Sequence, residues 1–216
     1  MPGILAVFND CAPEGREHFE TWYNREHLKE RVGLPGFHRG RRYQLVAGGD
    51  REFCAFYEVE APGVLNSDVY IGRLNDPTPW TQQAMKSFRN VVRTVCEVAA
   101  AAGDLIGSHA VVLRADAALA PTAAAATWVT ELAGQPGIAR VELWTRAAQQ
   151  TTADTAEMRS RGKDRLAAGV LLVECVRRAD ADRVMALLAS PPAALGLSGG
   201  TALGIYALLC LYRPGR

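Results

Sequence analysis

The sequence lacks the features that would place it in several large functional classes. Its formal net charge is only +1, so no overall charge attracts it to nucleic acid or to an anionic membrane. The five cysteines form no CxxC pair and no metal-type cluster, and four of them lie in apolar runs, where a free cysteine acts as a small hydrophobic residue. The glycines follow no phosphate-loop pattern, and no Gly-x-Ser-x-Gly motif occurs.

Targeting features and long apolar stretches are also missing. The opening residues MPGILAVFND have no basic start and reach an acidic residue before any long apolar run, so we expect no signal peptide. The late apolar run at 202–212 is too short to cross a bilayer. These absences predict a cytoplasmic protein with reduced cysteines that binds neither nucleic acid nor membranes.

The sequence does contain one order of strands and helices that occurs twice. Alternating and apolar runs predict four strands in the first half and four in the second. The predicted strands lie at 4–9, 37–46, 53–60, 89–98, 107–114, 138–146, 167–177 and 203–212. The predicted helices lie at 13–32, 62–73, 121–134 and 179–190. A Pro-Gly pair occupies the same helix-to-strand turn in both halves, at 35–36 and 136–137.

This order predicts the fold. A βαββαβ unit forms an antiparallel sheet with both helices on one face, and strands such as VLLVECV are apolar on both sides, so both sheet faces must be covered. We therefore predict an α+β fold of two ferredoxin-like βαββαβ repeats. Their antiparallel sheets pack face to face as an intramolecular, pseudo-dimeric α+β barrel. The chain would be a monomer with this internal pseudo-dimer, or a homodimer of it.

The two predicted halves differ in their polar residues. We expect the N-terminal half, 1–103, to carry the candidate site and the C-terminal half, 104–216, to be mainly structural. The alanine-rich stretch 98–104 is the predicted join between them. The polar stretch 147–164 is predicted to be an exposed linker.

The first predicted helix carries the main candidate residues. Trp22, Tyr23 and Glu26 share one of its faces, and His27 lies beside Tyr23. A face built only for a core would carry aliphatic residues there, so a carboxylate and an imidazole predict a pocket under the helix. His27 suits a general base, and Tyr23 could hold or protonate a substrate oxygen. The structural alternatives are a histidine that caps the helix and a core tyrosine with a satisfied hydroxyl.

The strand FHRGRRYQL alternates in direction, so at least one of Arg41 and Arg42 is expected to be partly buried. A buried guanidinium needs an anion. That anion is either a carboxylate of Glu26, Glu30 or Glu58, or the carboxylate or phenolate of a substrate.

An insertion before the fourth strand contains the proline-rich turn 76–80, which ends in Trp80. Rigid loops with a large aromatic residue often close the mouth of a pocket. Trp80 is therefore either a substrate contact or an anchor of the loop.

These residues together resemble a known family. The phrase WYxxEHL at 22–28, followed by PGF at 35–37 and RRY at 41–43, resembles dimeric α+β barrel proteins, in particular the EthD-like group. The resemblance is close over residues 4–60 and extends to 98, and the second half matches in architecture only. It implies that Tyr23 and His27 line a cavity, with Trp22 and Glu26 beside them. Asn9, at the end of the first strand, resembles the asparagine of haem-degrading relatives.

Members of this group include cofactor-free cyclases, lactone isomerases, quinone-forming monooxygenases and haem-degrading enzymes. The resemblance implies cofactor-free acid/base chemistry on a small aromatic or polyketide-like molecule, of the cyclase, isomerase or monooxygenase type. The alternatives are a non-catalytic barrel that binds a small ligand or is purely structural, and a haem-handling protein. No histidine lies where the haem partner is expected. We expect no cofactor and no metal, and the sequence leaves open whether the chain is an enzyme.

Overall fold

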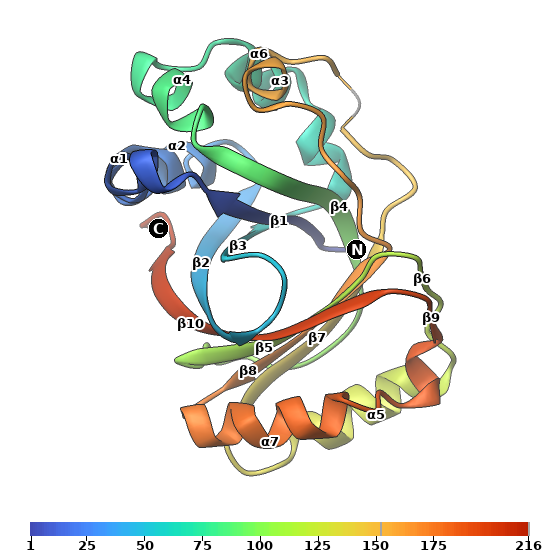
Figure 1. Ribbon diagram of the computed structural model, residues 1–216. Helices are drawn as coiled ribbons and strands as arrows, with labels where there is room; N and C mark the ends of the chain where they lie inside the picture. Colours follow the sequence, from blue (N-terminus) through green and yellow to red (C-terminus); the bar gives the residue numbers. More distant parts are fainter. Residues whose placement is uncertain (152, 216) are drawn as a thin grey trace.

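The computed structural model describes residues 1–151 and 153–215 as a closed antiparallel barrel (Figure 1). Its strands follow the order β1-β3-β2-β10-β5-β8-β7-β4. The first half contributes β1 (Gly3–Cys11), β2 (Phe37–Gly48), β3 (Phe53–Val59) and β4 (Phe88–Gly103). The second half contributes β5 (His109–Ala115), β7 (Ile138–Arg146), β8 (Gly169–Cys175) and β10 (Thr201–Tyr212). A small separate sheet pairs β6 (Ala118–Leu119) with β9 (Leu197–Ser198).

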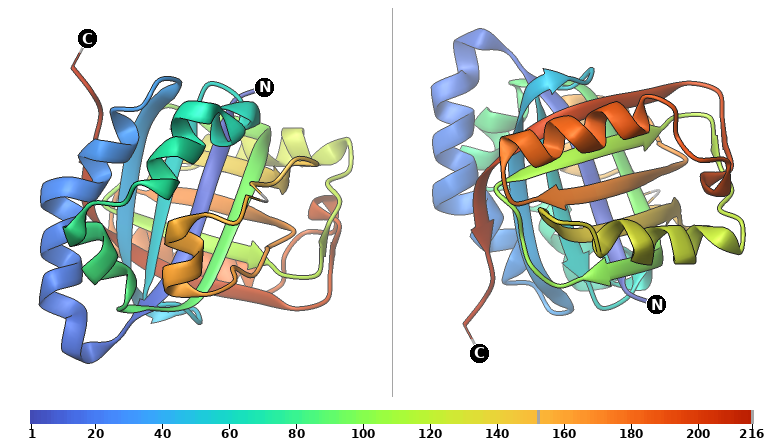
Figure 2. Two further views of the ribbon diagram at one scale, coloured as in Figure 1. Left: turned by 90° about the horizontal axis from the view of Figure 1, so that it is seen from above. Right: turned by 90° about the horizontal axis from the view of Figure 1, so that it is seen from below.

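Helices cover the outer surface of the barrel on two sides, as the views from above and below show (Figure 2). The first half supplies η1 (Pro13–Gly15), α1 (Arg16–Trp22), η2 (Tyr23–His27), α2 (Leu28–Val32), η3 (Pro62–Asn66), α3 (Asp68–Asn75) and α4 (Pro79–Met85). The second half supplies α5 (Ala124–Ala133), α6 (Ala156–Arg161), α7 (Arg178–Leu188) and η4 (Ala193–Leu195). Helix α7 covers strands of the second half and α5 covers β7 together with β4 of the first half, whereas α6 lies on the opposite side, near α3 and α4. Among the residues described, no helix has the length and apolar character needed to cross a membrane.

Period-2 alternation divides the buried residues between the barrel interior and the layers under the helices. The interior is filled by large side chains, among them Phe8, Tyr43, Phe56 and Trp144. The layer under the first-half helices is rich in aromatic residues, and the layer under α5 and α7 is mainly aliphatic. The barrel therefore has a packed interior, and the polar candidates lie mostly outside it.

The predicted α+β barrel of two βαββαβ units is confirmed. The eight predicted strands all occur near their predicted places, and each half runs strand, helix, strand, strand, helix, strand. Gly36 and Gly137, in the two Pro-Gly turns, both adopt φ +82°, a left-handed conformation that favours glycine. The two turns are therefore equivalent in backbone geometry as well as in sequence.

The structure corrects two details of the sequence interpretation. The predicted join at 98–104 is not a loose seam, because β4 continues to Gly103 and its residues 100–103 pair with β7. The stretch 147–164 is not simply exposed, because it folds back over the first half and buries Thr155 and Glu157.

Candidate functional site

An inner cavity of about 40 Å³ lies between the first-half helices and the outer face of β1, β3 and β4. The polar aromatic residues in its wall are Tyr23, His27, Tyr57 and Tyr70. Its charged residues are Arg31, Arg93, Glu157 and Arg161. The apolar wall consists of Leu5, Val7, Leu74, Met85 and Phe88. The cavity has room for a few water molecules and brings imidazole, phenol, guanidinium and carboxylate groups together in its wall.

A π-helical turn, η2, places Tyr23 and His27 in this wall. The backbone N–H of Leu28 donates to the carbonyl of Tyr23, an i→i+5 bond, so the predicted continuous helix at 13–32 widens here between α1 and α2. Single π turns within helices are rare and occur frequently at functional sites. Trp22 precedes the turn, and its indole stacks on His27, which ends it, with 4.1 Å between ring centroids.

His27 is held in its uncharged form. Its ring is 7% exposed and also meets Tyr23 edge-on. Burial, followed by the positive charges of Arg31, Arg161 and Arg42, lowers the pKa of His27 well below its ordinary value of 6.5. Its Nδ1 atom lies 3.9 Å from a Glu30 carboxylate oxygen and has no hydrogen-bond partner among the described residues. A neutral imidazole with an unengaged nitrogen can accept a proton.

Two tyrosine hydroxyls meet in the cavity wall. Tyr57 Oη donates to Tyr23 Oη at 3.1 Å, so the hydroxyl hydrogen of Tyr23 remains available to a molecule in the cavity. Burial raises the pKa of Tyr23, and burial together with Tyr23 raises the pKa of Tyr57 well above 10.0. Both phenols therefore keep their protons at neutral pH.

The charged part of the wall joins the two halves of the chain. Arg31, on α2, forms a buried ion pair with Glu157 on α6. The remaining terminal nitrogen of Arg31, Nη1, is buried without a hydrogen-bond partner among the described residues. Arg161, one helical turn after Glu157 on α6, pairs with Asp164 at 2.7 Å. The folded-back stretch thus supplies two of the cavity's charged residues.

Arg41 lies inside the barrel, away from the cavity. Its guanidinium is fully buried and contacts carboxylate oxygens of Glu174 at 2.7 Å, Glu58 at 2.9 Å and Glu142 at 3.2 Å. Tyr43 donates its hydroxyl to Glu174 as well. Of the partners expected from the sequence, Glu58 is present, and the second half supplies the other two. This network links strands of the two halves across the interior.

Arg42 points to the opposite side of β2 and lies behind Tyr23. Its guanidinium carbon is 4.5 Å from the Tyr23 ring centroid, 4.7 Å from that of Phe53 and 5.1 Å from that of Phe19. Its Nε and Nη2 atoms have no hydrogen-bond partners among the described residues. Arg42 does not line the inner cavity, but its charge acts on both Tyr23 and His27.

The other candidates support the cavity from outside. Trp22 donates its indole N–H to Thr81 Oγ1 at 3.1 Å, and Glu26 accepts from Thr78, the N-cap residue of α4, at 2.6 Å. Trp80 packs edge-on against His18 beside a surface depression. Asn9 donates to the adjacent carbonyl of Asp10 at 3.0 Å. Substrate contacts by these residues and by Arg41 and Arg42 stay predictions.

Sequence reasoning missed most of the cavity's charged wall. Arg31 follows His27 at helical spacing, and Tyr57 alternates with Phe53 and Ala55 on the helix-facing side of β3, so both carried a usable signal. Glu157 and Arg161 carried none, because only the folded chain brings them to the first half. In the part of the chain that is described, no group of three or more His, Cys, Asp or Glu side chains is placed to hold a metal ion.

Comparison with solved structures gives full-length matches to this architecture. An anthrone oxidase-like protein superposes with a TM-score of 0.61 over 100% of this chain and 94% of its own, at 10% identity. A predicted monooxygenase from Fusobacterium nucleatum superposes with a TM-score of 0.56 over 99% and 95% of the two chains, at 8% identity. A protein assigned as a chlorite dismutase gives a TM-score of 0.51 over 97% and 95%, at 12% identity.

The chain has the fold of the dimeric α+β barrel proteins. No protein-family model and no curated protein matches it. Within this dimeric α+β barrel fold, both units come from one chain, and an edge strand of each unit pairs with a strand of the other. Strand β10 pairs with β2 of the first half, and β7 pairs with β4.

Proposed function

We propose that this chain acts on a small aromatic or polyketide-like molecule by acid/base chemistry without a bound cofactor, with His27 as the base and Tyr23 as the proton donor. The observation that carries the proposal is the neutral His27, a residue of the cavity wall whose Nδ1 has no hydrogen-bond partner among the described residues. The same wall contains Arg31, whose Nη1 is likewise unengaged although its Nη2 pairs with Glu157, and Arg93, which forms no ion pair with the described residues. Hydrogen-bond donors placed around a developing oxyanion are the usual means by which such sites stabilise an enolate or phenolate.

The proposed step is a proton transfer. His27 takes a proton from an acidic C–H or O–H of the substrate, so that bond breaks, an N–H bond forms, and the electron pair passes to the substrate oxygen. The free donor of Arg31 stabilises that oxygen. The arginine charges that lower the pKa of His27 also make its imidazolium a strong acid, so it returns the proton readily. The free hydroxyl hydrogen of Tyr23 offers a second donor.

The resulting anion is common to three reaction classes. It can close a ring, be protonated again at another carbon, or reduce dioxygen. In the last case, a carbanion and O₂ with one proton form a hydroperoxide, and loss of water from it leaves a carbonyl. The fold-level likeness to an anthrone oxidase-like protein and to predicted monooxygenases supports this third class.

The cavity must widen before an aromatic ring can enter it, because about 40 Å³ holds only a few water molecules. Helix α6 is the element that we propose to move. It is held over the cavity by the ion pair of Glu157 with Arg31 and by the hydrogen bond from the backbone N–H of Ala156 to Asn75 Oδ1 at 3.1 Å. Breaking these contacts would open the side of the cavity that faces α6. Closure over the bound molecule would then exclude water.

The test is turnover in air with anthrone and related enolisable phenols, followed by oxygen consumption and product absorbance. We expect His27→Gln to reduce kcat/KM by roughly 100-fold or more and Tyr23→Phe by a smaller factor, with folding retained. His38→Gln is the matched control, because His38 is exposed on β2. Deuterium uptake from D₂O under nitrogen isolates the proton transfer from the reaction with oxygen. Unchanged rates in the His27 variant would remove the proposal.

The small size of the cavity also favours a second candidate, a non-catalytic barrel that binds a small ligand. This function predicts thermal stabilisation by phenols without any turnover. Haem is the weaker alternative, because the one histidine among the described residues of the cavity wall is stacked against Trp22. A haem titration that produced a bound absorption band would overturn this conclusion.

Several finer assignments belong to the same proposal. We assign the chain to the EthD-like group of these barrels, with a duplicated unit divided at 103/104. The partner is a small molecule, and the chain is a monomer or a homodimer of this barrel. Size measurement in solution tests the last point.

A further inference from the structure

A second, outer pocket of about 250 Å³ adjoins the inner cavity. The two share one wall residue, Arg93 on β4. The outer pocket also contains Gln150, Thr151, Lys163 and Asp164, which come from the stretch between β7 and β8. Arg93 therefore contacts both the outer pocket and the inner cavity that His27 lines.

Arg93 is a buried cation without a carboxylate partner among the described residues. Its side chain is 7% exposed, and no acidic group described lies within ion-pair distance. Only its Nη2 atom is engaged, donating to Tyr70 Oη at 3.0 Å and to Thr151 Oγ1 at 3.4 Å. Buried arginines usually bind an anion, so this one has unused capacity for one.

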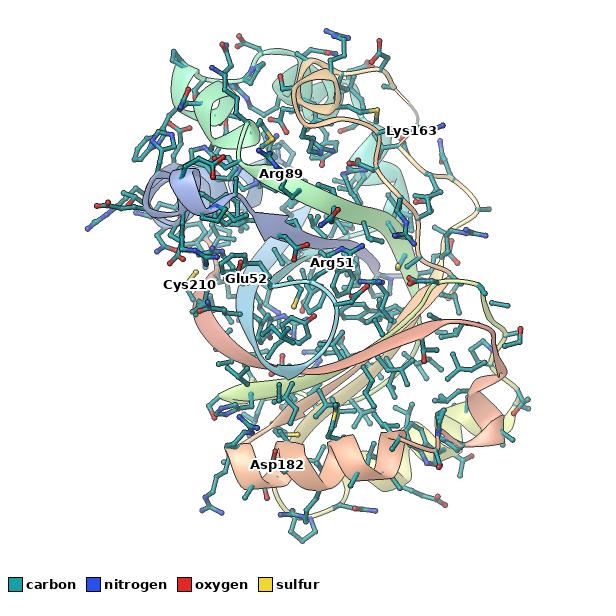
Figure 3. The ribbon with its side chains drawn as sticks, viewed as in Figure 1. Arg51, Glu52, Arg89, Lys163, Asp182 and Cys210 are labelled. Atoms are coloured by element: carbon teal, nitrogen blue, oxygen red, sulfur yellow. The ribbon has the colours of Figure 1, made fainter. Side chains whose placement is uncertain are left out.

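The other polar groups of the outer pocket decide the sign of its charge. Asp164 is already paired with Arg161, with its two carboxylate oxygens 3.0 Å and 2.7 Å from the guanidinium. Gln150 is saturated by the backbone of Val95 and Ala147. Lys163, which is labelled in Figure 3, lies on the folded-back stretch, is exposed, and forms no ion pair with the described residues. The pocket is left with two cations that form no ion pair with the described residues, Arg93 and Lys163, beside the Asp164 carboxylate, whose charge also acts on Arg93.

We propose that the outer pocket is an anion subsite in which Arg93 and Lys163 bind the carboxylate of the substrate while its aromatic ring occupies the inner cavity. This inference rests on the proposed function and narrows the substrate class to aromatic or enolisable molecules with a short carboxylate-bearing tail. Arg93, in the wall that the two pockets share, donates hydrogen bonds to the carboxylate, and Lys163 attracts the carboxylate at the entrance of the outer pocket. Neutral molecules of the same shape lose both interactions.

The experiment is calorimetric titration with 3-(4-hydroxyphenyl)propanoate and with its carboxamide, which has nearly the same shape and no charge. The wild-type protein is expected to bind the carboxylate roughly tenfold or more tightly than the amide, because charged hydrogen bonds are the strong ones. Lys163→Gln should reduce that ratio severalfold without changing the affinity for the amide. Added salt should weaken only the carboxylate.

Two further variants complete the design. Arg93→Gln should abolish the preference, and Lys29→Gln, a change at an exposed lysine of α2, should leave it intact. Lys163 is exposed, so its variant tests the subsite without endangering the fold. Equal binding of the two probes, binding of neither, or an equal loss for both in Lys163→Gln overturns the subsite.

The titrations can fail independently of the turnover test of the proposed function. If His27→Gln leaves turnover unchanged while the carboxylate preference persists and depends on Lys163, the acid/base function fails and the anion subsite stands. If the preference is absent while His27→Gln abolishes turnover, the subsite fails and the chemistry stands.

Discussion

The indole of Trp22 lies over the imidazole of His27, with an angle of 29° between the ring planes. The two residues are five apart in sequence and are brought together across the π-helical turn η2. The stacking fixes the orientation of the imidazole and covers one of its faces, so it helps to exclude the water that would stabilise a charged ring. The geometry of the turn and the neutral state of His27 are therefore linked.

His27 should make stability depend on pH. Its pKa is lowered in the folded protein, so below about pH 6.5 the unfolded chain binds more protons than the folded one, and stability falls as the pH falls. Through this one group, the free energy of unfolding should fall by up to about 1.4 kcal/mol for each pH unit, until the pH reaches the lowered pKa. Urea unfolding of the wild type and of His27→Gln between pH 4 and 7 measures it. Identical pH profiles for the two proteins would contradict the assignment.

Trp22 should contribute to both stability and site geometry. Trp22→Phe keeps a ring over His27 but loses the bond to Thr81, and we expect a loss of about 1 kcal/mol beyond the packing change. Trp22→Leu also removes the stacking and should cost about 3 kcal/mol. Denaturant unfolding gives both values, and the NMR titration of His27 should move toward its ordinary pKa only in the leucine variant. The decisive result is that Trp22→Leu loses more stability than Trp22→Phe.

Arg41 should behave as a structural residue. Arg41→Met leaves Glu174 buried without its cation, while Glu142 keeps Arg140, and removal of one partner of a buried ion pair costs about 3–5 kcal/mol. Arg178→Met, which breaks the exposed pair with Asp182 on α7, is the matched control and should cost at most about 1 kcal/mol. Guanidinium unfolding compares the two. A small effect at Arg41 would revive its candidacy as a substrate contact.

Glu157 should hold the folded-back stretch over the cavity. In Glu157→Gln the buried Arg31 loses its direct ion pair, so α6 should detach and unfold locally more often, which makes its backbone accessible to a protease. Limited trypsin digestion should then cut after Arg159, Arg161 or Lys163 several times faster than in the wild type. Asp154→Asn, at an exposed pair with Arg159, serves as the control. Equal digestion rates would show that the ion pair does not hold the segment.

Much of the architecture follows from local sequence. Three features of the sequence predict the local backbone from neighbouring residues alone. They are the alternation of the strands, the apolar character of VLLVECV on both sides, and the two Pro-Gly turns. The strand pattern of β2 likewise sends Arg41 and Arg42 to opposite sides, as alternation requires.

The cavity depended on contacts between distant residues. A helical wheel places Glu26 on the same face as Tyr23, but the π turn intervenes, and the Glu26 carboxylate binds α4 instead. No local pattern marks the turn, since its cost is offset by packing of Trp22, Tyr23 and His27 against strands that arrive later in the chain.

The sequence by itself determined two similar units, their strand order within each unit, and the polar character of the first long helix, because these depend on periodicity and on turn residues. Only the tertiary structure decided that the stretch at 147–164 crosses to the first half, that Glu157 meets Arg31, and that Arg93 divides two pockets. Such pairings join residues far apart along the chain, and their energies exist only once the barrel has closed.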